Sequence, residues 1–404
     1  SQKCVGMVMT VTLVVLAAGV MLPVGSVCLP TPQLGPPLRS PFAAPRRAFV
    51  SLQQPQTPER KSQPQNQPRK RRPPVPKKRP EGPPSRASGE DWGGLPAAVQ
   101  ASRCGAINNQ ISKAPDAADV LSIVQKNREI LNSVNVATAL HRIAGHLKRT
   151  RAERDRVMLD DRFKSLIEAS VEKAPTSNPR SVSDTLWACA TLRHLPPQML
   201  NPLLSQVAVH LERSSFEAQH LSLIVWSCAQ LECKPVRLLE LIEHATVKQL
   251  ATFNQQNCAN ILWGFAKLNY KPSTLMGPMA SRLVDQPFVQ KFKAVEVSDT
   301  AFAIAVLGSA EEHVPVMAAL SARAQSDTHL DSFTARQIVM LIWSHARLGV
   351  KPAQLPSWIE YIQDAHSRHA LLAQDRKNLE AALGRFGESA EWLHPPSEAG
   401  EGED

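Results

Sequence analysis

One short phrase recurs five times between residues 180 and 350, and its spacing constrains the fold more than any other feature of the chain. Each copy places an aromatic residue among small side chains, as at Trp263, which Gly264 follows directly. The aromatic residues lie 39, 37, 39 and 41 residues apart, at Trp187, Trp226, Trp263, Phe302 and Trp343. A fixed period in this range marks stacked supersecondary units. The sequence therefore predicts a repeat array whose function lies on a surface built jointly by several repeats.

The columns of the repeat predict two helices per unit when the aromatic residue is taken as position 0. An alanine always occupies position +3, at Ala190, Ala229, Ala266, Ala305 and Ala346. A leucine always occupies +5, and a proline occupies +9 in all copies except the fourth, which has Glu311 there. Apolar positions at −2, −1, +2 and +5 predict a helix with a wide buried face, and the small residue at +3 allows close helix approach. The proline marks the turn to a second amphipathic helix.

Degenerate copies extend the array at both ends. His141 stands in the aromatic position of an upstream copy, which a helix over about 116–131 precedes, and residues 378–386 form a downstream copy. A phenylalanine at position −10 begins four of the units and is expected to pack the joint between repeats, at Phe216, Phe253, Phe292 and Phe333. We therefore predict an all-α fold, a right-handed-type α-solenoid (superhelix) of about six to seven two-helix repeats of 37–41 residues, spanning residues 105–387.

The flanking segments are predicted to be targeting sequences and linkers. Residues 1–28 form a signal-like hydrophobic leader, with a single membrane anchor as the alternative. Residues 29–104 are predicted to be a Pro/Gln/Arg-rich disordered transit segment and linker, and residues 388–404 an acidic disordered tail. The combination resembles the bipartite leaders of plastids bounded by extra membranes, which implies plastid localisation with the mitochondrion as the alternative. Other interpretations of these segments are a signal peptide with a basic linker, or a nuclear or RNA-binding signal at 69–79.

The net charge of +10 is concentrated outside the repeats. Residues 1–80 carry thirteen Lys and Arg against Glu59, a balance of +12, and six acids fall within 388–404, which leaves residues 81–387 near +4. Bulk charge therefore gives the repeats little support for nucleic-acid binding. The sequence contains no nucleotide-binding loop, zinc spacing or nucleophile elbow, so we expect no catalytic residues, no metal site, no cofactor and no small-molecule substrate. Cys189 and Cys228 are interpreted as reduced core residues.

The repeat phrase resembles a known family. The pattern Leu-Trp-x-x-Ala-x-Leu-x-x-x-Pro, which residues 262–272 match best, resembles the octotricopeptide-type repeats of organelle RNA-binding proteins and the related heptatricopeptide and FAST-kinase-like families. The resemblance implies binding of single-stranded plastid or mitochondrial transcripts and a role in their stabilisation, processing, splicing or translation. It also implies other organelle gene-expression proteins as partners. Many members end in a small nuclease-like RAP domain, which the residues after Gly387 do not resemble.

Two polar columns near the start of the first helix are the candidate RNA-binding site. Column −6 holds hydrogen-bonding side chains that differ from one another, namely Asn135, Ser181, His220, Asn257, Glu296, Gln337 and Asp375. Column −7 adds polar candidates at Arg180, Gln219, Gln256 and Arg336. Variable identity with constant hydrogen-bonding ability is what a reader of one base per repeat needs. Helix capping alone also favours such residues in the first turn, and this alternative stays open.

A third column, one residue before the turn proline, could contact phosphates through Lys234, Lys271 and Lys351. Solvated turn lysines are the simpler interpretation. The first functional hypothesis is sequence-selective binding of single-stranded RNA in an organelle. The alternative is a non-catalytic protein-binding scaffold, for example in an organelle ribosome or membrane complex, for which mild charge suffices. An RNA-processing enzyme with unrecognised catalytic residues is the weakest hypothesis.

Overall fold

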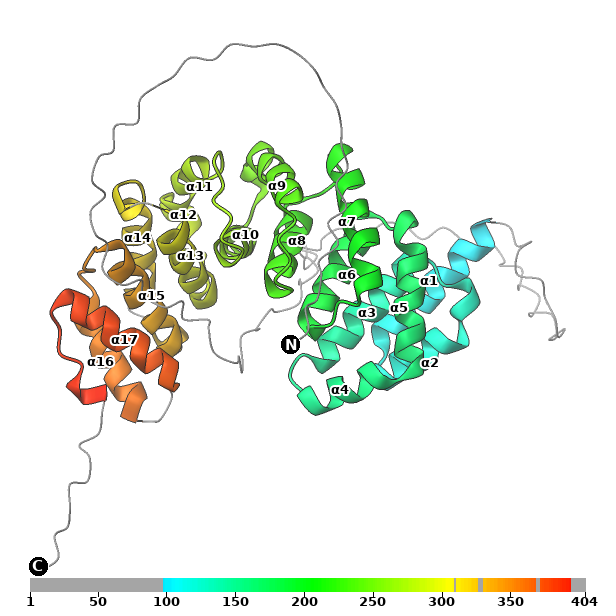
Figure 1. Ribbon diagram of the computed structural model, residues 1–404, viewed down its shortest axis with the longest axis horizontal. Helices are drawn as coiled ribbons and strands as arrows, with labels where there is room; N and C mark the ends of the chain where they lie inside the picture. Colours follow the sequence, from blue (N-terminus) through cyan, green and yellow to red (C-terminus); the bar gives the residue numbers. More distant parts are fainter. Residues whose placement is uncertain (1–96, 309, 326–329, 368–370, 394–404) are drawn as a thin grey trace, which may run out of the picture. The chain divides into compact units, whose positions relative to one another are not determined.

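The chain folds into helices that pack against one another in chain order (Figure 1). The computed structural model describes residues 97–308, 310–325, 330–367 and 371–393, and these residues contain no strand. The all-α class is thereby confirmed, and the packing of successive helices is that of an α-solenoid. The predicted leader, the 29–96 part of the transit segment and the acidic tail beyond residue 393 lie outside the described residues.

The first helix of each repeat belongs to one layer, here called the A layer. Its helices are α1 (Ala97–Lys113), α3 (Ser133–Leu147), α6 (Pro179–Leu192), α8 (Ala218–Gln230), α10 (Gln255–Lys267), α13 (Ala294–Leu307), α15 (Ala335–Leu348) and α17 (Ala373–Phe386). Each packs on the next A helix, and these contacts are the most extensive in the described structure. α1 begins at Ala97, before the predicted boundary at residue 105, and α17 ends at Phe386, followed by Gly387 with a φ of 72°. A left-handed glycine is a common way to end a helix.

The second helices form the B layer. They are α2 (Ala117–Lys126), α5 (Asp161–Lys173), α7 (Pro197–Glu212), α9 (Val236–Lys248), α11 (Met276–Leu283), α14 (Ala310–Gln325) and α16 (Leu355–Ser367). Two additional helices depart from the two-helix unit, α4 (Arg151–Leu159) and α12 (Gln286–Val289). Short 3-10 turns are η2 (Arg128–Ile130), η3 (Ala174–Thr176), η4 (Leu250–Thr252), η5 (Leu330–Ser332) and η6 (Glu391–Leu393). None of the described helices is long and apolar enough to cross a membrane.

Small residues allow the A helices to approach closely. A Cβ built on Gly264 would lie 2.7 Å from Val225 Cγ1 and 3.0 Å from the Val225 carbonyl oxygen, so a glycine is needed where α10 meets α8. The alanines at +3 are also buried. Such close contact over a whole layer removes apolar surface from water without large side chains at the interface.

Hydrogen bonds close four of the repeats on themselves at position −10. His210 Nε2 lies 2.8 Å from the carbonyl oxygen of Ser177, Gln249 Nε2 donates to that of Phe216 at 3.1 Å, and Arg282 Nη2 donates to that of Phe253 at 2.8 Å. The Tyr361 hydroxyl donates in the same way to the Phe333 carbonyl oxygen. In every case the second helix, or the residue just after it, binds a carbonyl that precedes the first helix of the same unit. We call these bonds the repeat clasps.

Candidate functional site

The aromatic residues at position 0 form the core between A helices. Their exposed fractions fall from 8% at Trp187 to 1% at Trp343. Rings of adjacent repeats meet in pairs, with centroids 4.5 Å apart for His141 and Trp187, 6.5 Å for Trp226 and Trp263, and 5.7 Å for Phe302 and Trp343. The phenylalanines at −10 are buried as well. The prediction that the repeat phrase is core is confirmed, and such rings offer little surface to a ligand.

Column −6 is the third residue of seven A helices, and in five of them it closes a capping box. The backbone N–H of Asn254 donates to Asn257 Oδ1 at 3.2 Å, and the N–H of Asn257 donates back to Asn254 Oδ1 at 2.8 Å. The backbone N–H of the N-cap residue is bound in the same way by the side chains of Asn135, His220, Glu296 and Gln337. Ser181 instead donates its own N–H to Asn178 Oδ1. These bonds satisfy amides that a helix start otherwise leaves without a partner.

Several residues of column −6 also join neighbouring repeats. Asn257 Nδ2 donates to Ser222 Oγ of the preceding repeat at 3.1 Å, in a buried bond. Asn135 Nδ2 donates to the carbonyl oxygen of Cys104 at 2.9 Å. Asp375 Oδ1 lies 3.5 Å from Arg336 Nε, which belongs to the repeat before it. At these three positions the side chain of column −6 is matched to a partner in the preceding repeat or helix.

Burial determines the electrostatics of column −6. Asn135, Ser181, Asn257, Glu296 and Asp375 are buried, whereas His220 and Gln337 are half-buried. Burial raises the pKa of the Glu296 and Asp375 carboxyls, and it lowers the pKa of His220. Nearby charges oppose these shifts, Arg336 in the case of Asp375. Most of the column faces other helices, so its members would have to leave their caps to touch a base.

The side chains of column −7 are less buried than those of column −6. Arg180 and Gln219 are exposed, and Gln256 and Arg336 are half-buried. Arg180 Nε lies 3.4 Å from Asp184 Oδ2, an exposed pair of little energetic weight. Gln219 and Gln256 occupy the same repeat position on α8 and α10, two helices that pack directly on each other.

Two further polar columns lie on the same face of the A helices as column −7, and they were not identified from the sequence. Position −3 is four residues after −7 and holds the half-buried Asp184 and Asn260. Position +4 holds Gln230, Lys267 and Arg347, which are half-buried or exposed. Spacings of three and four residues place side chains on one face of a helix, and this periodicity was the available signal. We call the polar residues at −7, −3 and +4 on the A helices the outward stripe.

Part of the outward stripe at +4 is already engaged in packing. Arg347 Nε donates to the carbonyl oxygen of Ala305 at 2.9 Å, and its guanidinium carbon lies 5.6 Å from the Trp343 ring. Arg385 Nη1 makes the equivalent bond to Ala346 at 3.3 Å. Both arginines therefore cap the carboxyl end of the preceding A helix, where a positive charge is favourable. They still add positive charge to that end of the layer.

The lysine column is exposed at the turns between layers. Lys234 Nζ donates to the carbonyl oxygen of Asn269 in the next repeat at 2.8 Å. Lys351 Nζ approaches that of Phe386 at 3.4 Å and forms an ion pair with Glu388 at 2.7 Å. Lys271 is exposed. Two of the three lysines thus tie adjacent repeats together while keeping a solvent-facing amine.

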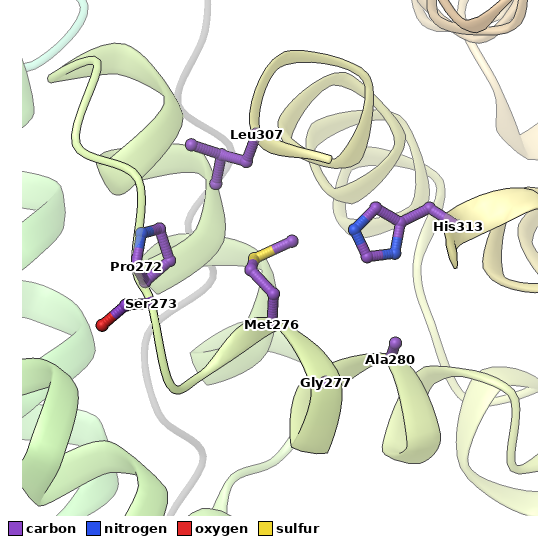
Figure 2. A pocket seen from close by; sticks show the side chains of 7 residues that line it. All are labelled: Pro272, Ser273, Met276, Gly277, Ala280, Leu307 and His313. Atoms are coloured by element: carbon purple, nitrogen blue, oxygen red, sulfur yellow. The ribbon is translucent and has the colours of Figure 1, made fainter. Parts of the chain in front are cut away.

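A cavity lies where α11 faces the end of α13 and the start of α14 (Figure 2). It has a volume of about 510 Å³, and it is lined by Pro272, Ser273, Met276, Gly277, Ala280, Leu307 and His313. His313 is the one titratable side chain in this lining, so the cavity offers no acid–base pair, and we assign no reaction to it. Across the described residues, no group of three or more His, Cys, Asp or Glu could hold a metal ion.

The buried cysteines are core residues. Cys189, Cys228 and Cys258 are free and buried, and burial raises the pKa of each thiol to about 12. Thiols in this state are inert packing groups. The prediction for Cys189 and Cys228 is confirmed.

Comparisons with known proteins supply no family. No protein-family model matches the chain, and no curated protein matches it significantly. The resemblance to octotricopeptide-type repeats stays a prediction that rests on the repeat phrase.

Proposed function

We propose that the repeat array binds single-stranded RNA along the outward stripe of the A layer. The observation that carries this proposal is the row of amide side chains on adjacent packed helices, Gln219 on α8 with Gln256 and Asn260 on α10. An amide carries both donors and acceptors, which suits it to the edges of unstacked bases. Successive repeats would then meet successive parts of one strand.

The proposal assigns different roles to the two candidate columns. Column −6 sets the register of each helix through its cap, and column −7 provides side chains that reach solvent. Because a cap fixes the start of the helix, the neighbouring residue at −7 is held in a defined place. The remaining predictions belong to the same proposal: a right-handed superhelix of six to seven repeats, of octotricopeptide type, acting in post-transcriptional control in a plastid or mitochondrion.

Enrichment of random RNA by the full-length protein, followed by sequencing, tests this proposal. We expect a short single-stranded motif, and we expect Gln256→Glu to change the preferred base at one position of that motif, because the substitution removes a donor. The enrichment is washed at raised salt, since residues 1–80 carry a balance of +12 and are expected to attract phosphates without sequence preference. Absence of any motif with the wild-type protein would refute the proposal.

A second candidate function is protein binding. Val236 and Leu241 on α9 are 47% and 41% exposed, which leaves apolar surface on the B layer. The same experiment separates the two functions, because a protein scaffold selects no RNA motif.

A further inference from the structure

The connection between α3 and α5 is longer than its counterparts in the next two repeats. It covers residues 148–160 and contains α4, whereas residues 193–196 connect α6 to α7 and residues 231–235 connect α8 to α9. Helix α4 is therefore an insertion into the repeat. It follows the carboxyl end of α3, so it lies at the edge of the A layer where A helices end (Figure 1).

Core packing does not account for the insertion. Helix α4 has no buried residue, and its contact with the core comes from Val157 and Met158 at its end. Leu159 is 75% exposed. A helix whose apolar contact is confined to its last turn adds little to the stability of a fold, because burial of an apolar face supplies most helical stability in proteins.

The insertion carries unbalanced positive charge. Residues 148–160 contain five cations, Lys148, Arg149, Arg151, Arg154 and Arg156, against Glu153, Asp155 and Asp160, which gives a balance of +2. Arg151 and Arg154 share one partner, with their Nε atoms 3.7 and 3.9 Å from Asp155. Glu153 accepts a hydrogen bond from the Thr150 hydroxyl. Arg149 and Arg156 are exposed and have no ion pair with any of the described residues.

We propose that α4 binds the phosphate backbone of the RNA whose bases meet the outward stripe, so this inference rests on the proposed function. Arg149 and Arg156 are the contacting residues, because they are the exposed guanidinium groups of the insertion that no carboxylate neutralises. Arginine suits phosphate oxygens in both charge and geometry. Lys267 and Arg347 lie at the carboxyl ends of other A helices, and Lys234 and Lys271 lie in the turns that follow, so the edge that α4 extends carries further cations.

The phosphate backbone is a better match for α4 than the bases are. Charged guanidinium groups on an exposed helix attract any phosphate, whereas base recognition needs side chains held in place by their neighbours. Helix α4 should therefore add affinity without sequence preference. It should also make binding more sensitive to salt, because each neutralised phosphate releases condensed counterions.

The double variant Arg149→Gln/Arg156→Gln tests the inference in the full-length protein. The matched control is Arg213→Gln/Lys248→Gln, which removes the same charge from exposed positions at the carboxyl ends of α7 and α9, away from the edge that α4 extends. Binding to the enriched RNA is measured between about 50 and 200 mM salt, the range over which such contacts change affinity strongly. We expect a loss of affinity of roughly tenfold in the α4 variant and a salt slope lower by about 1.4, from about 0.7 for each of two phosphates. The control should remain close to wild type.

Four outcomes would overturn the inference. Equal affinity and equal salt slope in the α4 variant and the control would show that α4 contributes no phosphate contact. The proposed function would stand in that case, because the wild-type protein would still bind RNA. A changed RNA motif in the α4 variant would indicate base contact instead. Unchanged RNA binding together with lost binding to vesicles containing anionic lipid would assign α4 to a membrane surface. If the wild-type protein selects no RNA at all, the proposed function fails and this inference fails with it.

Discussion

Replacing Asn257 with alanine distinguishes a capping residue from a base-reading residue. The substitution removes the acceptor for the Asn254 N–H and the buried donor to Ser222 Oγ. Each hydrogen bond contributes about 1 kcal/mol, and the loss of a capping interaction costs a similar amount. Alanine recovers about half a kcal/mol through its helix propensity. Allowing for the Ser222 hydroxyl left without this partner, we expect a loss of about 2 kcal/mol in the free energy of unfolding.

The neighbouring Gln256→Ala is the matched control, because this side chain is half-buried and its removal breaks no hydrogen bond found in the described structure. Its effect on the free energy of unfolding should stay below about 0.5 kcal/mol. Urea denaturation followed by far-UV circular dichroism measures both variants. RNA binding is then measured at low temperature, where both proteins are folded.

We expect the two variants to show opposite patterns. Asn257→Ala should lose stability but keep the wild-type RNA motif, and Gln256→Ala should keep its stability but bind RNA less tightly. The reasoning is refuted if Asn257→Ala is as stable as wild type and selects a different motif. In that case column −6 would be the reading column, as one interpretation of the sequence suggested.

Three further predictions concern packing and titration. Gly264→Ala should lose roughly 1–3 kcal/mol of stability, because the new methyl group meets the Val225 backbone, while Gly145→Ala, which meets nothing within 4 Å, should be neutral or stabilising in thermal melts. Burial would raise the pKa of the Glu243 carboxyl, but hydrogen bonds to its carboxylate hold this pKa below the usual value. Stability should therefore be lost as pH falls through the lowered pKa. In denaturation at several pH values, Glu243→Gln should lose less stability at acid pH than the wild type does. Burial lowers the pKa of His345 to about 4. The free energy of unfolding should therefore fall by up to roughly 3 kcal/mol as pH falls from 6.5 to 4. His345→Gln should flatten this part of the plot of stability against pH, and an unchanged slope would contradict the assignment.

The periodic positions of the core could be predicted from the sequence, because burial repeats with the unit. Trp187 and Trp343 occupy the same place in different repeats, and both are core residues. Polar positions were harder to interpret. A residue that caps a helix and a residue that faces solvent are both polar, so sequence alone did not separate Asn257 from Gln256. Their difference depends on which way the first turn faces, and that is set by packing against the preceding repeat.

The insertion also could not be predicted from the period of the repeats. Helix α4 belongs to no column, and its charges resemble those of any solvated helix. What distinguishes it is its position in an otherwise short turn, which becomes evident once α3 and α5 are placed. The end of the insertion is set by Asp160, the N-cap of α5, whose side chain accepts the Arg162 N–H at 2.8 Å.

The repeat clasps have a consequence for how such a chain can change over generations. In each clasp the acceptor is a main-chain oxygen, which every residue type carries, while the donor differs among His210, Gln249, Arg282 and Tyr361. A change of donor type therefore needs no compensating change in its partner. Each of these four repeats can change independently at this position through single substitutions, and its neighbours are not forced to co-evolve with it.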